Sequence, residues 1–190
     1  MPAATDPLAL FSLDVVKKWL KITSTEKDDD VVICANSASA EIEQQTNRIF
    51  VTRACSETFN GNGKARLMLR YRPVISIASL TIDDIAIDAS EYVLDARLGL
   101  ITLKARYFDA GIGNVVCAYE AGWDVQDGPN LPRDVYRAGL DLTKAIWDEW
   151  STGAIAMTSV TLANNTVMLK TSQFPQSVQR VLDRWEDKRA

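Results

Sequence analysis

The hydrophobic pattern of this chain changes its period twice, from helical to strand-like near residue 52 and back to helical near residue 123. The flanking parts repeat apolar residues every three to four positions, which is typical of amphipathic helices, whereas the central part has short alternating runs between turn residues. This order predicts an α+β fold: a helical bundle with an inserted antiparallel β module. The predicted bounds are residues 51–122 for the module, with residues 1–50 and 123–190 forming the bundle.

Two helices are predicted before the module. Ser12 precedes a short amphipathic helix and is a residue type that caps helix N-termini. A longer helix begins with Glu26 and has the acidic run Asp28 to Asp30 in its first turn, where the helix dipole favours negative charge. Asn47 and Arg48 mark its end. The spacing of its inward stripe suits close contact with another helix. This stripe contains Val31, Ala35, Ala38, Ile42 and Ile49.

The central module contains a series of short strand patterns. After a first run that ends near residue 59, strands are predicted at residues 64–70, 74–82, 92–94, 100–103 and 114–119. The residues Asn60 to Gly63 tolerate positive φ and predict a hairpin turn between the first two runs. Asp83 and Asp84 predict another turn, into a short return strand.

One long helix is predicted directly after the module. Pro132 stands where a first helical residue is expected, and Gly153 is expected to end the helix. Its apolar stripe leads to Trp147 and Trp150, which are expected in the core.

An arm and a terminal helix follow. Residues 154–173 alternate weakly around Asn164 and Asn165, which is typical of an extended arm or a loose hairpin. Pro175 opens a last helix with apolar residues on one face and charged residues elsewhere. Two uses of this helix stay open, packing on its own bundle and docking on a neighbour.

The chain contains no histidine among its 190 residues. Histidine is the usual general base at neutral pH and the commonest metal ligand, so its absence excludes Ser-His and Cys-His catalysis and His-ligated zinc. The net charge of -4 argues against a surface that grips nucleic-acid phosphates. No apolar run reaches the length of about eighteen residues that predicts a membrane span. We therefore expect no enzyme, no cofactor and no membrane partner.

Three cysteines, Cys34, Cys55 and Cys117, lie at wide spacings inside apolar segments. An odd number of cysteines without a clustered pattern predicts buried, reduced thiols that act as small hydrophobes, and therefore synthesis in the cytoplasm.

Two acidic clusters have both a chemical and a structural interpretation. The run Asp28 to Asp30 cannot converge on one cation, because consecutive helical residues point in different directions. Asp83 and Asp84, with Asp88 and Glu91 beyond them, would suit glycoside hydrolysis only if two carboxylates faced each other at the right separation. Helix-start electrostatics and turn chemistry explain both clusters, so no catalytic and no metal-binding residue is predicted.

Several short motifs follow one another along nearly the whole chain. They are Val-x-x-Trp-Leu at residues 16–20, Thr-Asn-Arg-Ile-Phe at 46–50, Pro-Val-Ile-Ser-Ile at 73–77, Tyr-Glu-Ala-Gly at 119–122, Leu-Pro at 131–132 and Phe-Pro at 174–175. Together with the acidic start of the second helix, their order and spacing resemble the head-tail connector family of tailed phages, the adaptor proteins that join the portal to the tail. None of these motifs is a catalytic fingerprint.

The resemblance implies a structural subunit that does no chemistry. Copies of such adaptors form a ring, commonly of twelve, beneath the portal protein, where the ring extends the DNA channel and provides a platform for a stopper or tail-completion protein. DNA would pass through without specific binding, in a virion neck assembled from protein made in the bacterial cytoplasm. The candidate contacts with the portal or a neighbouring subunit are Phe174, Val178, Val181, Leu182 and Trp185.

Two alternatives stay open. One is another neck or tail component, such as a stopper or a tail terminator, in which the β-rich centre would carry the assembly. The other is an acid-dependent hydrolase or a sugar-binding module, in which the acidic turn region would form a cleft with two facing carboxylates.

Overall fold

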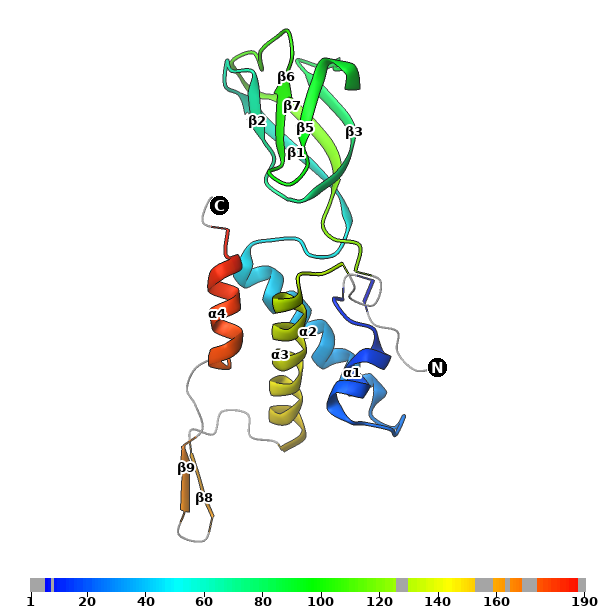
Figure 1. Cartoon of the computed structure of the whole chain (residues 1–190), viewed down its shortest axis with the longest axis vertical. Coiled ribbons are helices and arrows are strands. Elements are labelled where there is room, and N and C mark those ends of the chain that lie inside the picture. Colours follow the sequence, from blue (N-terminus) through cyan, green and yellow to red (C-terminus); the bar gives the residue numbers. More distant parts are fainter. Residues whose placement is uncertain are drawn as a thin grey trace. The chain divides into compact units, whose positions relative to one another are not determined.

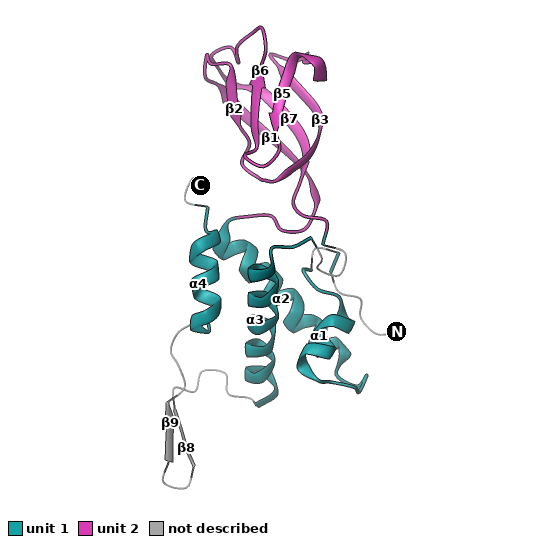
Figure 2. Cartoon of the chain, in the orientation of Figure 1, with its two compact units in different colours: residues 1–47, 125–188 teal, residues 48–124, 189–190 magenta. Residues whose placement is uncertain are grey.

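The computed structural model describes residues 6–7, 9–125, 130–152, 159–162, 165–168 and 174–187. These residues form two compact units (Figure 2). Unit 1 contains the described residues up to 47 and from 125 onwards, and unit 2 contains residues 48–124. Unit 1 is built around helices and unit 2 contains β-strands, so the predicted α+β fold class is confirmed.

Helices form the body of unit 1 (Figure 1). They are α1 (Leu13–Leu20), α2 (Asp28–Thr46), α3 (Arg133–Thr152) and α4 (Gln176–Trp185). α2 contacts α1, α3 and α4, and α3 also contacts α1 and α4. The helical part of the predicted α2 stripe is buried in this bundle, from Val31 to Ile42. None of the described helices has both the length and the apolar character needed to cross a membrane.

The helix ends lie close to their predicted positions. α2 ends as predicted at Asn47, which has a left-handed φ of 53° and donates its backbone N–H to Gln44 O. Pro132 directly precedes α3 and accepts a hydrogen bond from the Tyr136 N–H. Ser12 occupies the N-cap position of α1, but its side chain makes no capping hydrogen bond there. The predicted end of α3 at Gly153 lies outside the described residues.

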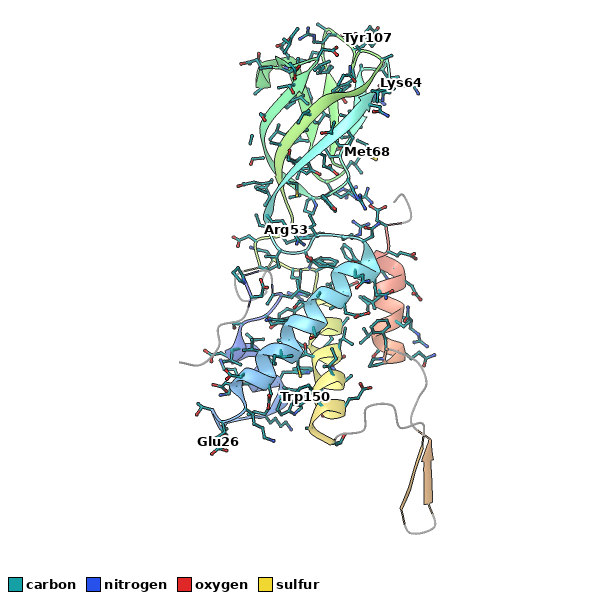
Figure 3. The ribbon with its side chains drawn as sticks, turned by 180° about the vertical axis from the view of Figure 1, so that it is seen from behind. Glu26, Arg53, Lys64, Met68, Tyr107 and Trp150 are labelled. Carbon is teal, nitrogen blue, oxygen red and sulfur yellow. The ribbon has the colours of Figure 1, made fainter. Side chains whose placement is uncertain are left out.

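The prediction that Trp150 lies in the core is wrong. Its side chain is 49% exposed, although Thr143, two turns earlier on the same helix face, is fully buried. Figure 3 shows Trp150 near the C-terminal end of α3. Trp147 is partly buried, with the Lys27 Nζ 5.7 Å from its ring centroid. Helical periodicity identifies the inward face of α3, but it does not show where the covering helices stop.

Unit 2 contains two antiparallel sheets. The strands are β1 (Arg53–Gly61), β2 (Arg66–Met68), β3 (Val74–Ile82), β4 (Ile85–Ala86), β5 (Tyr92–Asp95), β6 (Leu100–Leu103) and β7 (Gly111–Ala121), with a 3-10 helix, η1, at Ala89–Glu91. One sheet has the order β1-β7-β3-β4 and the other has the order β2-β6-β5. Their shared core includes Leu69, Ile101, Phe108, Val115 and Tyr119.

Two strands have their predicted bounds, but the first predicted turn is wrong. β3 and β6 have the predicted bounds, and the turn at Asp83 and Asp84 connects β3 to β4 with φ values of 49° and 63°. The hairpin predicted across Asn60 to Gly63 is wrong, because β1 pairs with β7 whereas β2 pairs with β6. The turn residues therefore carry the chain from one sheet to the other.

A paired stem brings the two ends of unit 2 together. Arg53 lies opposite Ala121, and the Trp123 N–H donates to Phe50 O over 2.9 Å. The Phe50 and Trp123 rings stack with their centroids 5.2 Å apart. Gly122 has a φ of 119°, and a Cβ at this position would lie 2.7 Å from Val51 O. The stem therefore requires glycine at this position.

The predicted arm contains one described hairpin. β8 (Ser159–Leu162) pairs antiparallel with β9 (Asn165–Met168), which is one of the two forms predicted for this segment. The other residues of the predicted 154–173 arm lie outside the described residues.

Candidate interaction surfaces

The predicted contact residues lie on α4 and directly before it. Phe174, Val178 and Leu182 are buried, and Val178 has no exposed surface. Val181 and Trp185 are partly buried. Because α4 contacts α2 and α3, its apolar face packs on the bundle of its own chain. Of the two uses left open for this helix, the structure shows the intramolecular one.

Polar contacts fix the C-terminal end of α4. The indole Nε1 of Trp185 donates a hydrogen bond to Asp134 Oδ2 over 2.9 Å, and Arg184 forms an ion pair with the same carboxylate at 3.3 Å. The Asp187 backbone N–H donates to Thr46 O at the end of α2, over 2.8 Å. Asp134 stands in the first turn of α3, so these contacts tie α4 to the ends of two other helices.

The opposite face of α4 is polar. It exposes Gln179, Arg180, Asp183 and Arg184. The Gln179 side chain also donates to Asp183 along the helix, over 2.7 Å. These side chains are exposed, whereas the apolar face of α4 is covered by the bundle.

A buried ion pair joins α1 to α2. Lys17 Nζ lies 2.5 Å from Asp28 Oδ1, and the two side chains are only 14% and 7% exposed. Helix-start electrostatics accounts for Asp28 in the sequence, but the partner Lys17 is not predicted from it. The pairing follows from the packing of two helices, and a helical pattern alone does not reveal it.

A second polar network lies inside unit 2. Tyr119 in β7 donates its hydroxyl hydrogen to Glu57 in β1, and the same hydroxyl accepts the Tyr71 N–H over 3.2 Å. The Arg70 N–H also donates to Glu57, over 3.2 Å. Burial and the hydrogen bond to Glu57 raise the pKa of Tyr119, so the hydroxyl stays protonated and can donate. The network connects the β1-β7 pair to the segment after β2.

The acidic turn region has structural contacts. Asp83 and Asp84 form the turn between β3 and β4. Asp88 caps η1 and accepts the Ser90 N–H over 2.8 Å. Hydrogen bonds from the Ser90 side chain and from the Ser90 backbone lower the pKa of Asp88. Glu91 completes the capping box by accepting the Asp88 N–H, and it forms an ion pair with Arg106 at 3.5 Å. Among the described residues, no group of three or more acidic or cysteine side chains is placed to hold a metal ion.

The three cysteines are free thiols. Cys34 and Cys117 are buried as predicted, whereas Cys55 is only partly buried, which corrects the prediction for that residue. Burial raises the pKa of all three thiols, and that of Cys117 rises to about 12. The thiols are therefore mainly protonated at neutral pH.

Unit 2 exposes several large apolar side chains. They are Met68, Ile75, Ile85, Val93, Leu98, Tyr107 and Ile112. Tyr107 and Lys64 lie at the same end of this unit in Figure 3. Ile75 stands on β3 and Ile85 on β4, the two strands at one side of the four-stranded sheet.

The comparisons with known proteins agree with this architecture. A family model described as "HCP: Head completion protein" matches residues 9–186. A search of curated proteins found no match. In the neck of an empty gene transfer agent (GTA) particle computed with C6 symmetry, a chain aligns with a TM-score of 0.68 and 16% identity, covering 99% of this chain and 94% of that chain.

Two further solved structures have the same fold. In the neck of the native GTA particle computed with C12 symmetry, the TM-score is 0.64 at 17% identity, with 99% of this chain and 94% of that chain covered. In the virion of the native particle the TM-score is 0.64 at 16% identity, with the same two coverages of 99% and 94%.

The family match spans elements of both units, from before α1 to the end of α4. It confirms the predicted head-tail connector resemblance and the connector role at the level of the family. The chain therefore belongs to the head completion protein family.

Proposed function

We propose that this chain is an adaptor subunit of a virion neck, whose copies form a ring beneath the portal protein. The observation that carries the proposal is the family match over residues 9–186, which leaves neither unit outside the head completion protein model. The necks of the GTA particles that contain chains of the same fold were computed with C6 and C12 symmetry. A ring of identical subunits, commonly twelve, is the matching arrangement for this chain.

In this proposal the ring extends the DNA channel and offers a platform to a stopper or tail-completion protein. The net charge of -4 supports a channel role, because a strongly basic wall would bind the phosphates and hold the DNA. The proposal includes no catalytic step. The acidic turn residues serve a turn, a helix cap and an ion pair, so their placement is explained without hydrolysis.

The terminal helix enters the proposal as the portal or neighbour contact. Val181 and Trp185 retain some exposure and can take part while α4 stays on its bundle. Phe174, Val178 and Leu182 are buried and can contact a partner only if α4 leaves its own chain and packs on a neighbour. The predicted arm of residues 154–173 precedes α4 and is long enough in sequence to allow such an exchange, which can therefore be tested.

Electron microscopy of the purified chain mixed with DNA-filled, portal-bearing heads tests the proposal. We expect a symmetric ring at the portal vertex and heads that then accept tails. Asp84→Asn is the matched control, because Asp84 is an exposed turn residue whose change should leave rings and tail joining intact. Protein that stays monomeric on such heads, or rings found only on tails that lack heads, would count against the proposal.

The last outcome would favour the alternative role, that of another neck or tail component such as a tail terminator. A tail terminator would bind tails that lack heads and would leave the portal vertex bare. Binding to isolated tails in the absence of heads therefore separates the two roles.

A further inference from the structure

The middle of β3 is an uncovered sheet edge. β3 pairs with β7 on one side, but on its other side β4 pairs only with Thr81 and Ile82. Next to these contacts, the Ile87 N–H donates to Leu80 O, and the Val74 N–H donates to Ala96 O at the start of the strand. Residues 75–79 lie between these contacts. In the described part of the chain, no strand is paired with them on this side.

The composition of this edge differs from that of the edges of the three-stranded sheet. β3 has the sequence Val-Ile-Ser-Ile-Ala-Ser-Leu-Thr-Ile, with no charged residue, proline or glycine. The edge strands β2 and β5 of the other sheet are only 3 and 4 residues long and carry Arg66 and Asp95. Natural proteins protect exposed edges with short strands and charges, because unprotected edges pair with other chains. The uncharged edge of β3 lacks both of these protections.

Two side chains make the same side of the sheet apolar. Ile75 is 50% exposed on β3, and Ile85 is 60% exposed on β4. The bulges of β3, between Val74 and Ser76 and between Ile77 and Ser79, bend the strand locally. Bulges are among the features by which proteins limit open-ended edge-to-edge pairing, so a partner strand at this edge has to match the local bend.

The opposite edge of the same sheet is β1, and β7 is the strand that pairs with it among the described residues. Its exposed residues between the ends are small and neutral, namely Ala54, Ser56 and Thr58. Glu57 on this strand is already held by Tyr119 and Arg70, so the charge of β1 is used inside the unit. The sheet is therefore open at two different edges, one on each side.

We propose that residues 75–79 of β3 pair with the β1 edge of the next copy of this chain. Two different surfaces that meet head to tail generate a closed ring when the rotation between copies closes. Each copy then covers the uncharged edge of its neighbour, and the four-stranded sheets join around the ring. The occupant is a second copy because one chain carries both open edges of the sheet. This inference rests on the proposed function, which supplies the ring.

Edge-blocking variants test the pairing. Ile75→Lys with Ala78→Lys places two charges on exposed positions of the β3 edge, and Ala54→Lys with Thr58→Lys does the same on the β1 edge. Ile112→Lys is the matched control, since Ile112 is 95% exposed at the start of β7 and away from both edges. Circular dichroism melts would confirm that all three variants fold like the wild type.

Mass photometry and electron microscopy, in solution and on portal-bearing heads, give the readout. We expect rings from the wild type and the control, and monomers of 21.0 kDa from each edge-blocked variant. An equal mixture of the two blocked variants should form dimers and no rings. The intact β3 edge of one variant can pair with the intact β1 edge of the other, and the two edges that stay free are both blocked.

The outcomes separate this inference from the proposed function. Normal rings from both folded edge variants would overturn the strand pairing and leave the ring proposal standing. Normal rings that no longer join heads or tails would assign the edge to another virion protein and would likewise overturn the pairing with a second copy. A wild type that forms no ring in solution or on heads would overturn the proposed function and this inference with it.

Discussion

The two units of this chain reach a buried core by different routes. Unit 2 uses one continuous stretch, residues 48–124, and two sheets enclose its core. Unit 1 combines α1 and α2 from the first part of the chain with α3 and α4 from the last part. Unit 2 can therefore fold from one continuous segment of the chain. Unit 1 requires two segments to meet that are separated by the whole of unit 2. We expect unit 2 to survive changes that unfold unit 1.

Deletion of residues 174–190 should have the largest effect. It removes Phe174, Val178 and Leu182, and each buried side chain of this kind contributes about 1.5–3 kcal/mol. Their sum is comparable to the whole stability of a small domain, so unit 1 should unfold. Hydrogen exchange would show lost protection in α2 and α3 with full protection in β1 and β7. Loss of protection in both units at once would show that unit 2 does not stay folded without unit 1.

Two matched core substitutions come next. Ile42→Ala in unit 1 and Ile101→Ala in unit 2 each truncate a side chain that is no more than 1% exposed. Each should lower the stability of its own unit by about 2–5 kcal/mol. Calorimetry combined with hydrogen exchange should show that only the altered unit opens earlier. A common shift of both units would mean that they unfold as one cooperative body.

Asp28→Asn should destabilise unit 1 by about 3 kcal/mol, because it leaves the buried Lys17 charge without its carboxylate partner. Chemical denaturation followed by the helical circular dichroism signal measures this effect. The double variant Lys17→Met with Asp28→Leu is the control, since it removes both charges together and should recover much of the loss. A double variant as unstable as Asp28→Asn would mean that packing, and not the unpaired charge, is responsible.

Tyr119→Phe should destabilise unit 2 by about 1–3 kcal/mol, because Glu57 loses a donor and the Tyr71 N–H loses its acceptor. The same denaturation experiment, read by hydrogen exchange in β1 and β7, measures it. Tyr107→Phe serves as the control, because Tyr107 is 62% exposed and its change should be neutral. Equal effects of the two substitutions would contradict the role of the network.

Thiol labelling should give the smallest effect, and it compares the opening of the two units through single cysteines. Below the raised pKa values the thiols are protonated, so Cys34 and Cys117 should react at pH 7 only when their units open, and the partly buried Cys55 should react first. Mass spectrometry over time would report the opening of unit 1 through Cys34 and that of unit 2 through Cys117. Faster labelling of Cys117 than of Cys34 would reverse the expected order of stability.

Much of the local structure could be predicted from sequence. The α2 stripe from Val31 to Ile42 follows from helical periodicity, because burial of one face leaves a regular pattern. The bounds of β3 follow from a run of strand-favouring residues between turn residues. The pairing of β1 with β7 could not be predicted in this way. The two strands are far apart in sequence, and the turn at Asn60 to Gly63 is compatible with a hairpin as well as with a crossover between sheets.

The interaction surfaces were predicted less completely for a related reason. The apolar face of α4 was visible in the sequence, but the choice between its own bundle and a neighbour depends on contacts such as Trp185 with Asp134. The uncharged character of residues 74–82 was also visible. Its meaning depends on the position of β3 in the sheet, which only the topology provides.

The paired stem of unit 2 has a consequence for loop-closure entropy. Closing a flexible loop costs more as the loop lengthens, by about 0.6 kcal/mol for each doubling. Because Phe50, Thr52 and Trp123 hold the ends of the inserted stretch together, unit 1 experiences residues 48–124 as a short connection once unit 2 has folded. The insertion can therefore grow, shrink or be exchanged for another folded module at little entropic cost, provided that the replacement keeps its two ends adjacent.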